Sequence, residues 1–346
     1  MESRLHEVQA GLYPKHHLWG IDALEKHDDF EIDWIKVDNS GFHPLAERLL
    51  NRSIFRGSLG VNIEKSILKA SHNSDLIYSV CGPPAVAKLI NKKVISWVFR
   101  SPEKVARGLM HSYTPVNLSE HKAFICLTPK AEKYYSQYTN SKFTPWCVDL
   151  DLFDGREPSK NLLAPFFLSS GKTGRDYDTL LKAAPLVNAE IRIIGPSKQK
   201  PAKLPPNVNW INTTSDPPDQ AIDYPTLRDW YAQSVGVCIP LSGDADDTCG
   251  YTNMLEAMAM RKPVLMTMSG CLHISPKNDG FGTEIKPRDA QGWAHAMNQL
   301  LLDSHKTKEM GNRGRVIAER DFTIVRFNKD ILEFIQTNLS KIDRRK

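Results

Sequence analysis

The sequence predicts an α/β protein made of two mostly parallel sheets that follow one another along the chain. Three observations support this: strand-like apolar runs alternate with helical ones, short turns containing Gly and Pro separate them, and the alternation restarts after residues 151–161. Strands that alternate with helices form parallel sheets with helices packed on the faces. The length of 346 residues fits two domains, because single domains commonly have about 100–200 residues.

The elements are predicted from the spacing of their apolar residues. The first half should begin with a strand at residues 5–12, a helix at 19–26 and a strand at 30–37. Further strands are expected at 75–80, 93–99 and 123–127, and helices at 63–70, 85–91 and 129–138. In the second half, strands are expected at 165–169, 190–194, 208–212, 235–239 and 263–266, and helices at 178–185, 225–233, 250–260, 289–302 and 324–339. The polar stretch 151–161, with Gly155 and Pro158, is the predicted domain boundary.

The composition is that of a globular protein, with 41% hydrophobic and 25% charged residues. No long apolar run is present and residues 1–20 lack the apolar block of a secretory signal, so we expect a cytoplasmic protein. The six cysteines make no CxxC pair and are expected to be reduced. The histidines lack metal-ligand spacing, and the adjacent His16 and His17 should point their rings apart, so no metal site is expected.

Charge is distributed unevenly along the chain, whose net charge is only +5. Residues 1–47 carry 4 Lys and Arg against 10 Asp and Glu, a net −6, whereas residues 48–107 carry 11 against 3, a net +8. A basic stretch of this kind fits peripheral contact with an anionic membrane or a phosphorylated acceptor. The alternative is a solvated surface whose charges spread out once the chain folds.

The turn after the predicted strand 165–169 has the features of a phosphate site. Ser170, Gly171 and Gly174 allow a tight turn that leads into a helix, and Lys172 and Arg175 add two positive charges three residues apart. Free backbone N–H groups at such a turn, together with two cations, bind phosphate well. The alternative is an ordinary surface turn.

The predicted helix at 250–260 has the second candidate group. Gly250 precedes it, and the backbone N–H groups of Tyr251, Thr252 and Asn253 should be unpaired donors suited to a phosphate. The carboxylate of Glu256 can accept two hydrogen bonds from a sugar diol such as ribose. The alternative is a glutamate that only complements the helix dipole.

Together these segments resemble the donor half of a GT-B glycosyltransferase, most closely glycosyltransferase family 4. The most specific match is Gly250, Leu255-Glu256-Ala257-Met258-Ala259 and Lys262-Pro263-Val264 in that order. Val148-Asp149-Leu150-Asp151-Leu152-Phe153 resembles the family's linker, Asp279-Gly280-Phe281-Gly282 a later loop, and Glu309-Met310-Gly311 with Arg315 its closing helix. The resemblance covers residues 145–335 well and the first half in outline.

The resemblance implies two Rossmann-like domains facing a central cleft, with a C-terminal helix that crosses back. The implied domains are 1–150 for the acceptor, 151–325 for the nucleotide-sugar donor, and 326–346 for the crossing helix. The implied reaction is metal-independent, cofactor-free transfer of a sugar from a nucleotide diphosphate sugar, with retention, to a hydroxyl of a glycan, lipid-linked or other acceptor, as in polysaccharide biosynthesis.

The resemblance also implies roles for individual residues. Lys172 and Arg175 would bind the diphosphate and Glu256 the ribose, as the catalytic set. The first Glu of the family's Glu-(seven residues)-Glu motif falls at Thr248, and Asp246 or Asp247 could replace it. The remaining donor-binding positions are Ser170, Gly171, Gly195, Gly250, Tyr251, Thr252 and Asn253.

The acceptor side of the site is expected in the first half of the chain. The candidate residues are His17 or Lys15, Gly20, and Arg100, which follows the strand 93–99. His111 is ranked lower. Two other functions stay open: a sugar-nucleotide epimerase of the same fold and a non-catalytic sugar-nucleotide-binding protein. No aromatic-interleaved basic motif is present, so a nucleic-acid partner is not expected.

Overall fold

The computed structural model divides the chain into two compact units, and each is described separately. One, the six-stranded unit, combines residues 1–18 with 146–327, and the other, the four-stranded unit, combines 19–145 with 328–346. The structure describes residues 4–38, 43–91, 93–102, 111–157, 164–213, 222–243, 248–268 and 271–343. The predicted first domain, 1–150, includes residues 1–18, which the structure groups with the second half of the chain.

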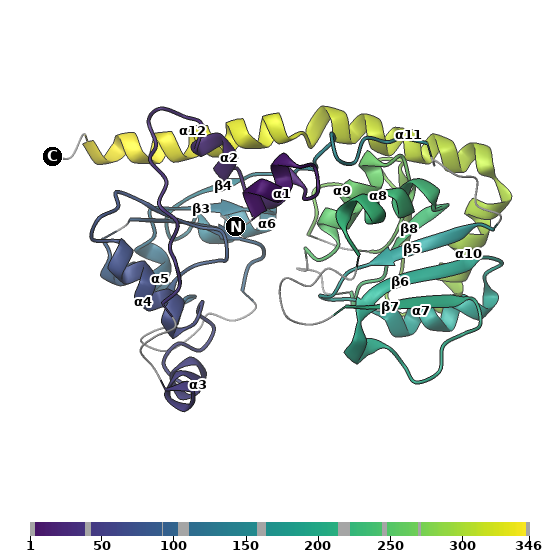
Figure 1. Cartoon of the computed structure of the whole chain (residues 1–346), viewed down its shortest axis with the longest axis horizontal. Coiled ribbons are helices and arrows are strands. Elements are labelled where there is room, and N and C mark those ends of the chain that lie inside the picture. Colours follow the sequence, from purple (N-terminus) through teal and green to yellow (C-terminus); the bar gives the residue numbers. More distant parts are fainter. Residues whose placement is uncertain are drawn as a thin grey trace. The chain divides into compact units, whose positions relative to one another are not determined.

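The six-stranded unit contains a fully parallel sheet (Figure 1), with strand order β10-β9-β8-β5-β6-β7. Its strands are β5 (Phe166–Ser170), β6 (Glu190–Pro196), β7 (Val208–Thr213), β8 (Gly236–Ile239), β9 (Val264–Thr267) and β10 (Gly282–Ile285). The first five confirm the predicted strands. The edge strand β10 was missed because its sequence, Gly-Thr-Glu-Ile, contains a single large apolar residue and gives no strand pattern.

Helices pack on this sheet as the alternating sequence predicted. They are α7 (Tyr177–Ala183), η4 (Ala184–Leu186), η5 (Ser197–Gln199), α8 (Tyr224–Gln233), α9 (Tyr251–Ala259), α10 (Ala290–Leu302) and α11 (Ser304–Asp321). Helices α7 and α10 share one core cluster with the strands, and α8 and α9 contact β5, β8 and β9. Aspartates at the N-caps of α7, α8 and α10 accept backbone N–H bonds and so fix where these helices begin.

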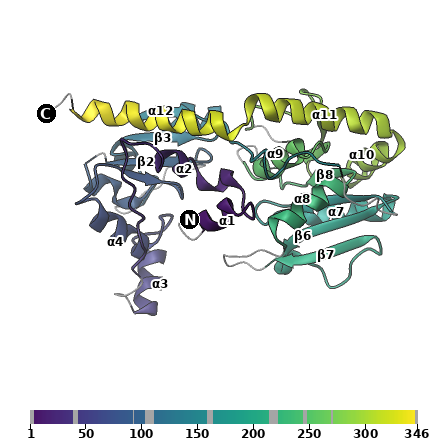
Figure 2. The ribbon, with the colours of Figure 1, turned by 45° about the horizontal axis from the view of Figure 1, so that its top comes forward.

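The four-stranded unit has a second parallel sheet, with strand order β1-β2-β3-β4. Its strands are β1 (Ile77–Ser79), β2 (Val94–Val98), β3 (Ala123–Cys126) and β4 (Asn140–Phe143), and its helices are α2 (Ile21–Leu24), α3 (Pro44–Arg52), α4 (Val61–Ala70), η3 (Ala85–Leu89), α5 (Pro115–Ser119) and α6 (Pro129–Tyr135). Strands β2 and β3 are buried along their whole length, which explains their continuous apolar sequences. Figure 2 shows α3 lying away from the sheet of this unit.

Two predicted strands near the N-terminus were wrong. Residues 5–12 contain the helix α1 (Leu5–Gln9), which buries none of its side chains, and residues 31–38 form neither helix nor strand. The period-two pattern at 30–37 indicates an extended backbone, but a strand also needs a neighbour to pair with. The predicted helix 85–91 is the 3-10 helix η3.

The last helix, α12 (Ile324–Asp343), begins among residues of the six-stranded unit and belongs to the four-stranded unit from Asn328 onward. In that unit Asn140 donates to the side-chain oxygen of Asn338 at 3.0 Å. The predicted crossing of the C-terminal helix is confirmed at the level of fold. Among the described residues, no helix is both long and apolar enough to span a bilayer.

Candidate functional site

The two motifs singled out from the sequence meet in the six-stranded unit. Arg175, in the turn between β5 and α7, donates from Nη2 to Oδ1 of Asn253 on α9 at 2.6 Å. Its guanidinium also donates to the backbone oxygens of Ser170 and Thr173, at 3.0 to 3.3 Å. Only 8% of Arg175 is exposed. Its positive charge is therefore held in place by hydrogen bonds on both sides of the turn.

Two glycines make this arrangement possible. Gly171 has φ of +138° and Gly250, just before α9, has φ of +85°, conformations that residues with a Cβ rarely adopt. A Cβ at Gly171 would collide with the Arg175 guanidinium, and one at Gly250 with the side chain of Ile239. Glycine is thus required at both positions by the local geometry.

Glu256 lies on the second turn of α9 and is only 2% exposed. Its Oε2 accepts from the Tyr231 hydroxyl at 2.8 Å and from Nδ2 of Asn253 at 3.4 Å. Burial raises the pKa of Glu256 to about 7, although these bonds and His17 act in the opposite direction. The carboxyl group is therefore linked through Asn253 to Arg175 and changes charge near neutral pH.

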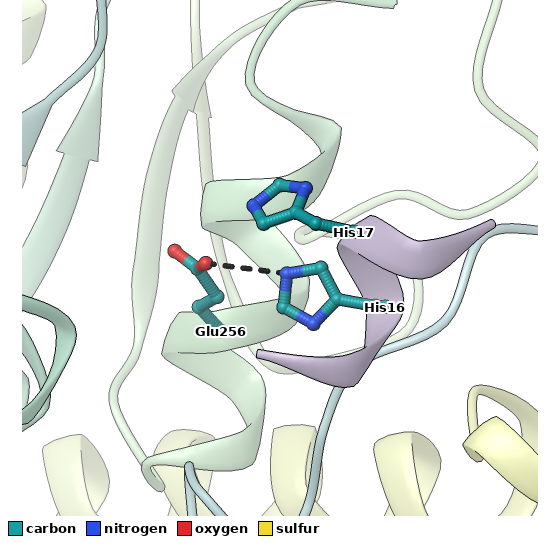
Figure 3. A group of neighbouring side chains, drawn as sticks. All are labelled: His16, His17 and Glu256. Carbon is teal, nitrogen blue, oxygen red and sulfur yellow. Dashed lines mark ion pairs between the residues drawn. The ribbon is translucent and has the colours of Figure 1, made fainter. Parts of the chain in front are cut away.

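The other oxygen of Glu256 faces a histidine of the N-terminal segment. His16, in the 3-10 helix η2 (Lys15–Leu18), points its Nε2 at Oε1 of Glu256 from 3.6 Å (Figure 3). Its Nδ1 accepts from the backbone N–H of Asp149 at 3.2 Å, and burial lowers its pKa to about 4. An acceptor Nδ1 in a neutral ring leaves the proton on Nε2. A neutral N–H group, not an imidazolium, therefore faces the carboxyl group.

His17 and Lys15 attach the same helix to the six-stranded unit. Nε2 of His17 lies 3.1 Å from the Tyr224 hydroxyl of α8, and burial lowers the pKa of His17 to about 3. The backbone N–H of Lys15 donates to the Asp149 carboxylate at 2.9 Å, and its ammonium to Asp151 at 2.6 Å. The expectation that the His16 and His17 rings point apart was wrong, since their centroids are 4.4 Å apart on the tight 3-10 helix.

His16, His17 and Glu256 form a group whose possible metal-binding atoms all lie within 4.8 Å of one another. The tautomer of His16 argues against a metal ion in this conformation, because a ring nitrogen that carries a proton cannot bind one. The peptide N–H of Asp149 would lose its acceptor if the proton moved to Nδ1. We therefore interpret the group as two neutral histidines packed against the Glu256 carboxyl group.

The remaining donor-side residues lie at the same end of the sheet. Ser170 ends β5, Gly195 is in β6, and the exposed Lys172 is in the turn with Arg175. Thr248 and Thr252 flank the start of α9, while Asp246 and Asp247 lie outside the described residues. One expectation was wrong: the backbone N–H of Tyr251 donates to the Thr248 oxygen at 3.2 Å, so it is not an unpaired helix-start donor.

The predicted acceptor-side residues fall in different units. Lys15 and His17 belong to the six-stranded unit, where the Asp149 carboxylate accepts from the backbone N–H of Lys15, and their acceptor-side role stays a prediction. Gly20 precedes α2, and Arg100 follows β2, where its backbone oxygen accepts from the Tyr135 hydroxyl at 3.2 Å. Both, like His111, belong to the four-stranded unit.

Sequence reasoning missed four residues around Glu256: His16, Asp149, Tyr224 and Tyr231. Asp149 lies in a segment recognised only as a linker, and the adjacent histidines were read as diverging. The two tyrosines lie on α8, outside every motif singled out from the sequence, and gave no signal. All four reach the site from segments far from α9 in the sequence.

Comparisons with known proteins agree with this geometry. Residues 166–303 match the family described as glycosyl transferases group 1. The fold is similar to sucrose-phosphate synthase from Thermosynechococcus elongatus, with TM-score 0.62, 15% identity and coverage of 90% of this chain and 86% of the other. It is also similar to a glycosyltransferase from Rickettsia africae, with TM-score 0.59, 16% identity and coverage of 92% and 87%.

A third similar structure is HepE from Anabaena in complex with UDP, with TM-score 0.57, 14% identity and coverage of 85% of this chain and 89% of the other. No curated protein matches the chain. The family match and the shared fold define the class of protein: the chain has the GT-B fold, carries a glycosyl transferases group 1 segment and is a glycosyltransferase. The predicted fold and enzyme class are confirmed.

Proposed function

We propose that this protein transfers a sugar from a nucleoside diphosphate sugar to an acceptor hydroxyl, with retention of the anomeric configuration and without a metal ion. One observation carries the proposal: the Arg175 guanidinium and the Glu256 carboxyl group are joined through Asn253 in one buried network. A fixed cation beside a carboxyl group matches a nucleotide, whose diphosphate is anionic and whose ribose offers a diol.

In this proposal the six-stranded unit stabilises the leaving group. When the bond to the sugar breaks, negative charge grows on the diphosphate. Lys172, Arg175 and the N-terminal end of α9 supply positive charge there, and such preorganised donors stabilise a transition state more than a ground state. Glu256 accepts hydrogen bonds from the ribose. The residue at position 248 is Thr, so we expect contacts to the donor sugar that differ from those made by the family's first Glu.

We propose UDP-glucose as the first donor to test. HepE, which has a similar fold at 14% identity, has been solved with UDP and also with UDP-glucose. The acceptor is proposed to be a glycan or lipid-linked hydroxyl, and the setting a cytoplasmic step of polysaccharide biosynthesis. His17, Gly20 and Arg100 stay the candidates for the acceptor side.

The test is a panel of UDP-, GDP- and ADP-sugars, each incubated with the protein in the presence of a chelator, with melting temperature and nucleotide release measured. We expect one nucleotide class to raise the melting temperature and to be consumed, with hydrolysis as the reaction when no acceptor is added. A panel in which no donor binds and none is consumed would refute the proposal.

The same panel separates the two alternatives. A sugar-nucleotide epimerase converts the donor to its epimer with no acceptor present, which nuclear magnetic resonance of the recovered donor detects. A non-catalytic binding protein raises the melting temperature with a donor and consumes none, even with a mixture of glycan and lipid-linked acceptors. We expect instead that the anomeric proton of the product keeps the configuration of the donor.

A further inference from the structure

Helix α3 (Pro44–Arg52) of the four-stranded unit is well formed and yet buries none of its residues. His43 caps it, accepting from the backbone N–H of Leu45 at 3.3 Å, and Pro44 occupies its first turn. It is fastened to the next helix by Asn51, whose side-chain oxygen accepts from the backbone N–H of Val61 at 2.8 Å. Figures 1 and 2 both show it lying away from the sheet of its unit. The helix therefore contributes little to a core.

The apolar side chains of α3 point outward. Leu45 and Leu49, one helical turn apart, are 64% and 68% exposed, and Ile54 in the following turn is 49% exposed. The partly buried positions are Ala46, Glu47, Leu50 and Asn51, on the opposite side of the helix. Single exposed leucines are common on protein surfaces, but Leu45 and Leu49 at i and i+4 form an apolar strip along the helix, and Ile54 adds an exposed apolar side chain in the turn after it.

Arginines flank this strip. Arg48 and Arg52 are at the positions i+3 and i+7 from Leu45, on the same side of the helix, and Arg56 follows Ile54. All three are exposed, and within the described residues no ion pair holds any of them. Glu47 is the one acidic residue between 43 and 60. Leu45, Arg48, Leu49, Arg52, Ile54 and Arg56 are called the α3 face below.

We propose that the α3 face docks on the surface of an anionic membrane. The leucines and Ile54 enter the boundary between headgroups and acyl chains, while the arginines extend their charged ends to the lipid phosphates. A second copy of this chain fits less well, because a symmetric contact would bring the positive charges of Arg48 and Arg52 from both copies into one interface with a single acidic residue, Glu47, from each. Two apolar side chains on a short helix and a third in the turn after it predict weak, reversible and salt-sensitive binding.

Three of the positive charges in the basic stretch 48–107, whose net charge is +8, lie on the α3 face. The cations that matter are the three on the α3 face. The proposal does not depend on the donor site, since α3 belongs to the other unit, and it holds or fails whatever nucleotide the protein uses.

The test is co-sedimentation of the full chain with vesicles of phosphatidylcholine alone or of phosphatidylcholine mixed with phosphatidylglycerol, at low and high salt. We expect binding to the anionic vesicles only, lost at high salt. Leu45→Ser with Leu49→Ser, and separately Arg48→Gln with Arg52→Gln, should each lower the bound fraction about tenfold. All four positions are exposed, so the melting temperature should stay unchanged.

Matched controls use exposed residues of the six-stranded unit. Leu302→Ser with Val325→Ser removes side chains that are 78% and 80% exposed, and Lys306→Gln with Lys308→Gln removes two exposed charges. Both controls should bind vesicles as the wild type does. Equal binding to neutral and anionic vesicles, binding to neither, or unchanged binding by the α3 variants would overturn the proposal. So would self-association in solution that only the α3 variants abolish, because that result assigns the face to a second copy.

Discussion

The six-stranded and four-stranded units use positive charge in opposite ways. In the six-stranded unit, Arg175 is 8% exposed and its guanidinium is fixed by two backbone oxygens and Asn253. In the four-stranded unit, Arg48 and Arg52 lie on an exposed helix. A buried charge must be fully hydrogen-bonded, which fixes its position, whereas exposed charges act together, weakly and over a longer range. The first arrangement suits recognition of one ligand, and the second suits a surface.

The sharpest way to test the fixed arrangement is Arg175→Lys. Lysine keeps the charge but is a single ammonium that cannot bond to Ser170, Thr173 and Asn253 together. We expect turnover to fall by about 10²- to 10³-fold, as when a transition-state donor is removed, and the melting temperature to fall as well. Arg320→Lys, at an exposed position on α11, is the matched control and should leave both unchanged. Wild-type turnover by Arg175→Lys would show that the charge alone is sufficient.

The next effect is a dependence of donor binding on pH. A carboxylate accepts ribose hydrogen bonds through both oxygens only when ionised, and burial raises the pKa of Glu256 to about 7. The affinity for a nucleotide sugar should therefore fall as pH drops below 7, approaching about tenfold for each pH unit. A donor sugar is preferable to free UDP because its diphosphate has no terminal group that titrates in this range.

The other groups that face Glu256 do not change charge in that window. His16 and His17 in η2 have pKa values lowered to about 4 and about 3, so both stay neutral above pH 5. Burial raises the pKa of Tyr231 and Tyr224 in α8, and both stay protonated. Glu256→Gln should bind weakly at every pH, and a wild-type affinity that is flat between pH 5.5 and 8 would contradict the assignment.

The smallest expected effect concerns the 3-10 helix η2, which packs against Glu256. At 2% exposure, Glu256 can meet a ribose only if η2 moves. Tyr224→Phe removes the hydroxyl that bonds His17, and should therefore make nucleotide binding about 2- to 10-fold tighter, the equivalent of one hydrogen bond. Tyr138→Phe in the four-stranded unit is the control. Weaker nucleotide binding by Tyr224→Phe would mean that η2 supports the ligand rather than competing with it.

The parts of the fold that the sequence predicted well are those whose pattern is set by burial. Strands β5, β8 and β9 are buried from end to end or nearly so, and their continuous apolar runs located them within two residues. The strand predicted at residues 30–37 was wrong, because alternating apolar residues indicate an extended backbone but do not show whether a neighbouring strand pairs with it. Helix α3 was not among the predicted elements, although Leu45 and Leu49 have helical spacing, and its apolar side chains face outward instead of toward a core.

The site was predictable where it is local and not where it is distant. Arg175, Asn253 and Glu256 lie in a turn and in a helix whose residue types are typical of phosphate and sugar binding. The residues that surround them could not be predicted in this way. Tyr231 lies 25 positions before Glu256 in the sequence, and His16 lies in the N-terminal segment. Nothing in the composition of residues 1–18 indicates that Asp149 holds them, so the shift in the Glu256 pKa could not be predicted.

The central claim is that Glu256 recognises the ribose of the donor nucleotide. The most direct test is calorimetric titration of the wild type and of Glu256→Gln with UDP and with 2′-deoxy-UDP, with the guanosine and adenosine pairs alongside. We expect the wild type to bind its ribonucleotide about tenfold more tightly than the deoxy form, and Glu256→Gln to lose most of this preference. A wild type that does not distinguish the two forms, or the same preference in Glu256→Gln, would contradict the central claim.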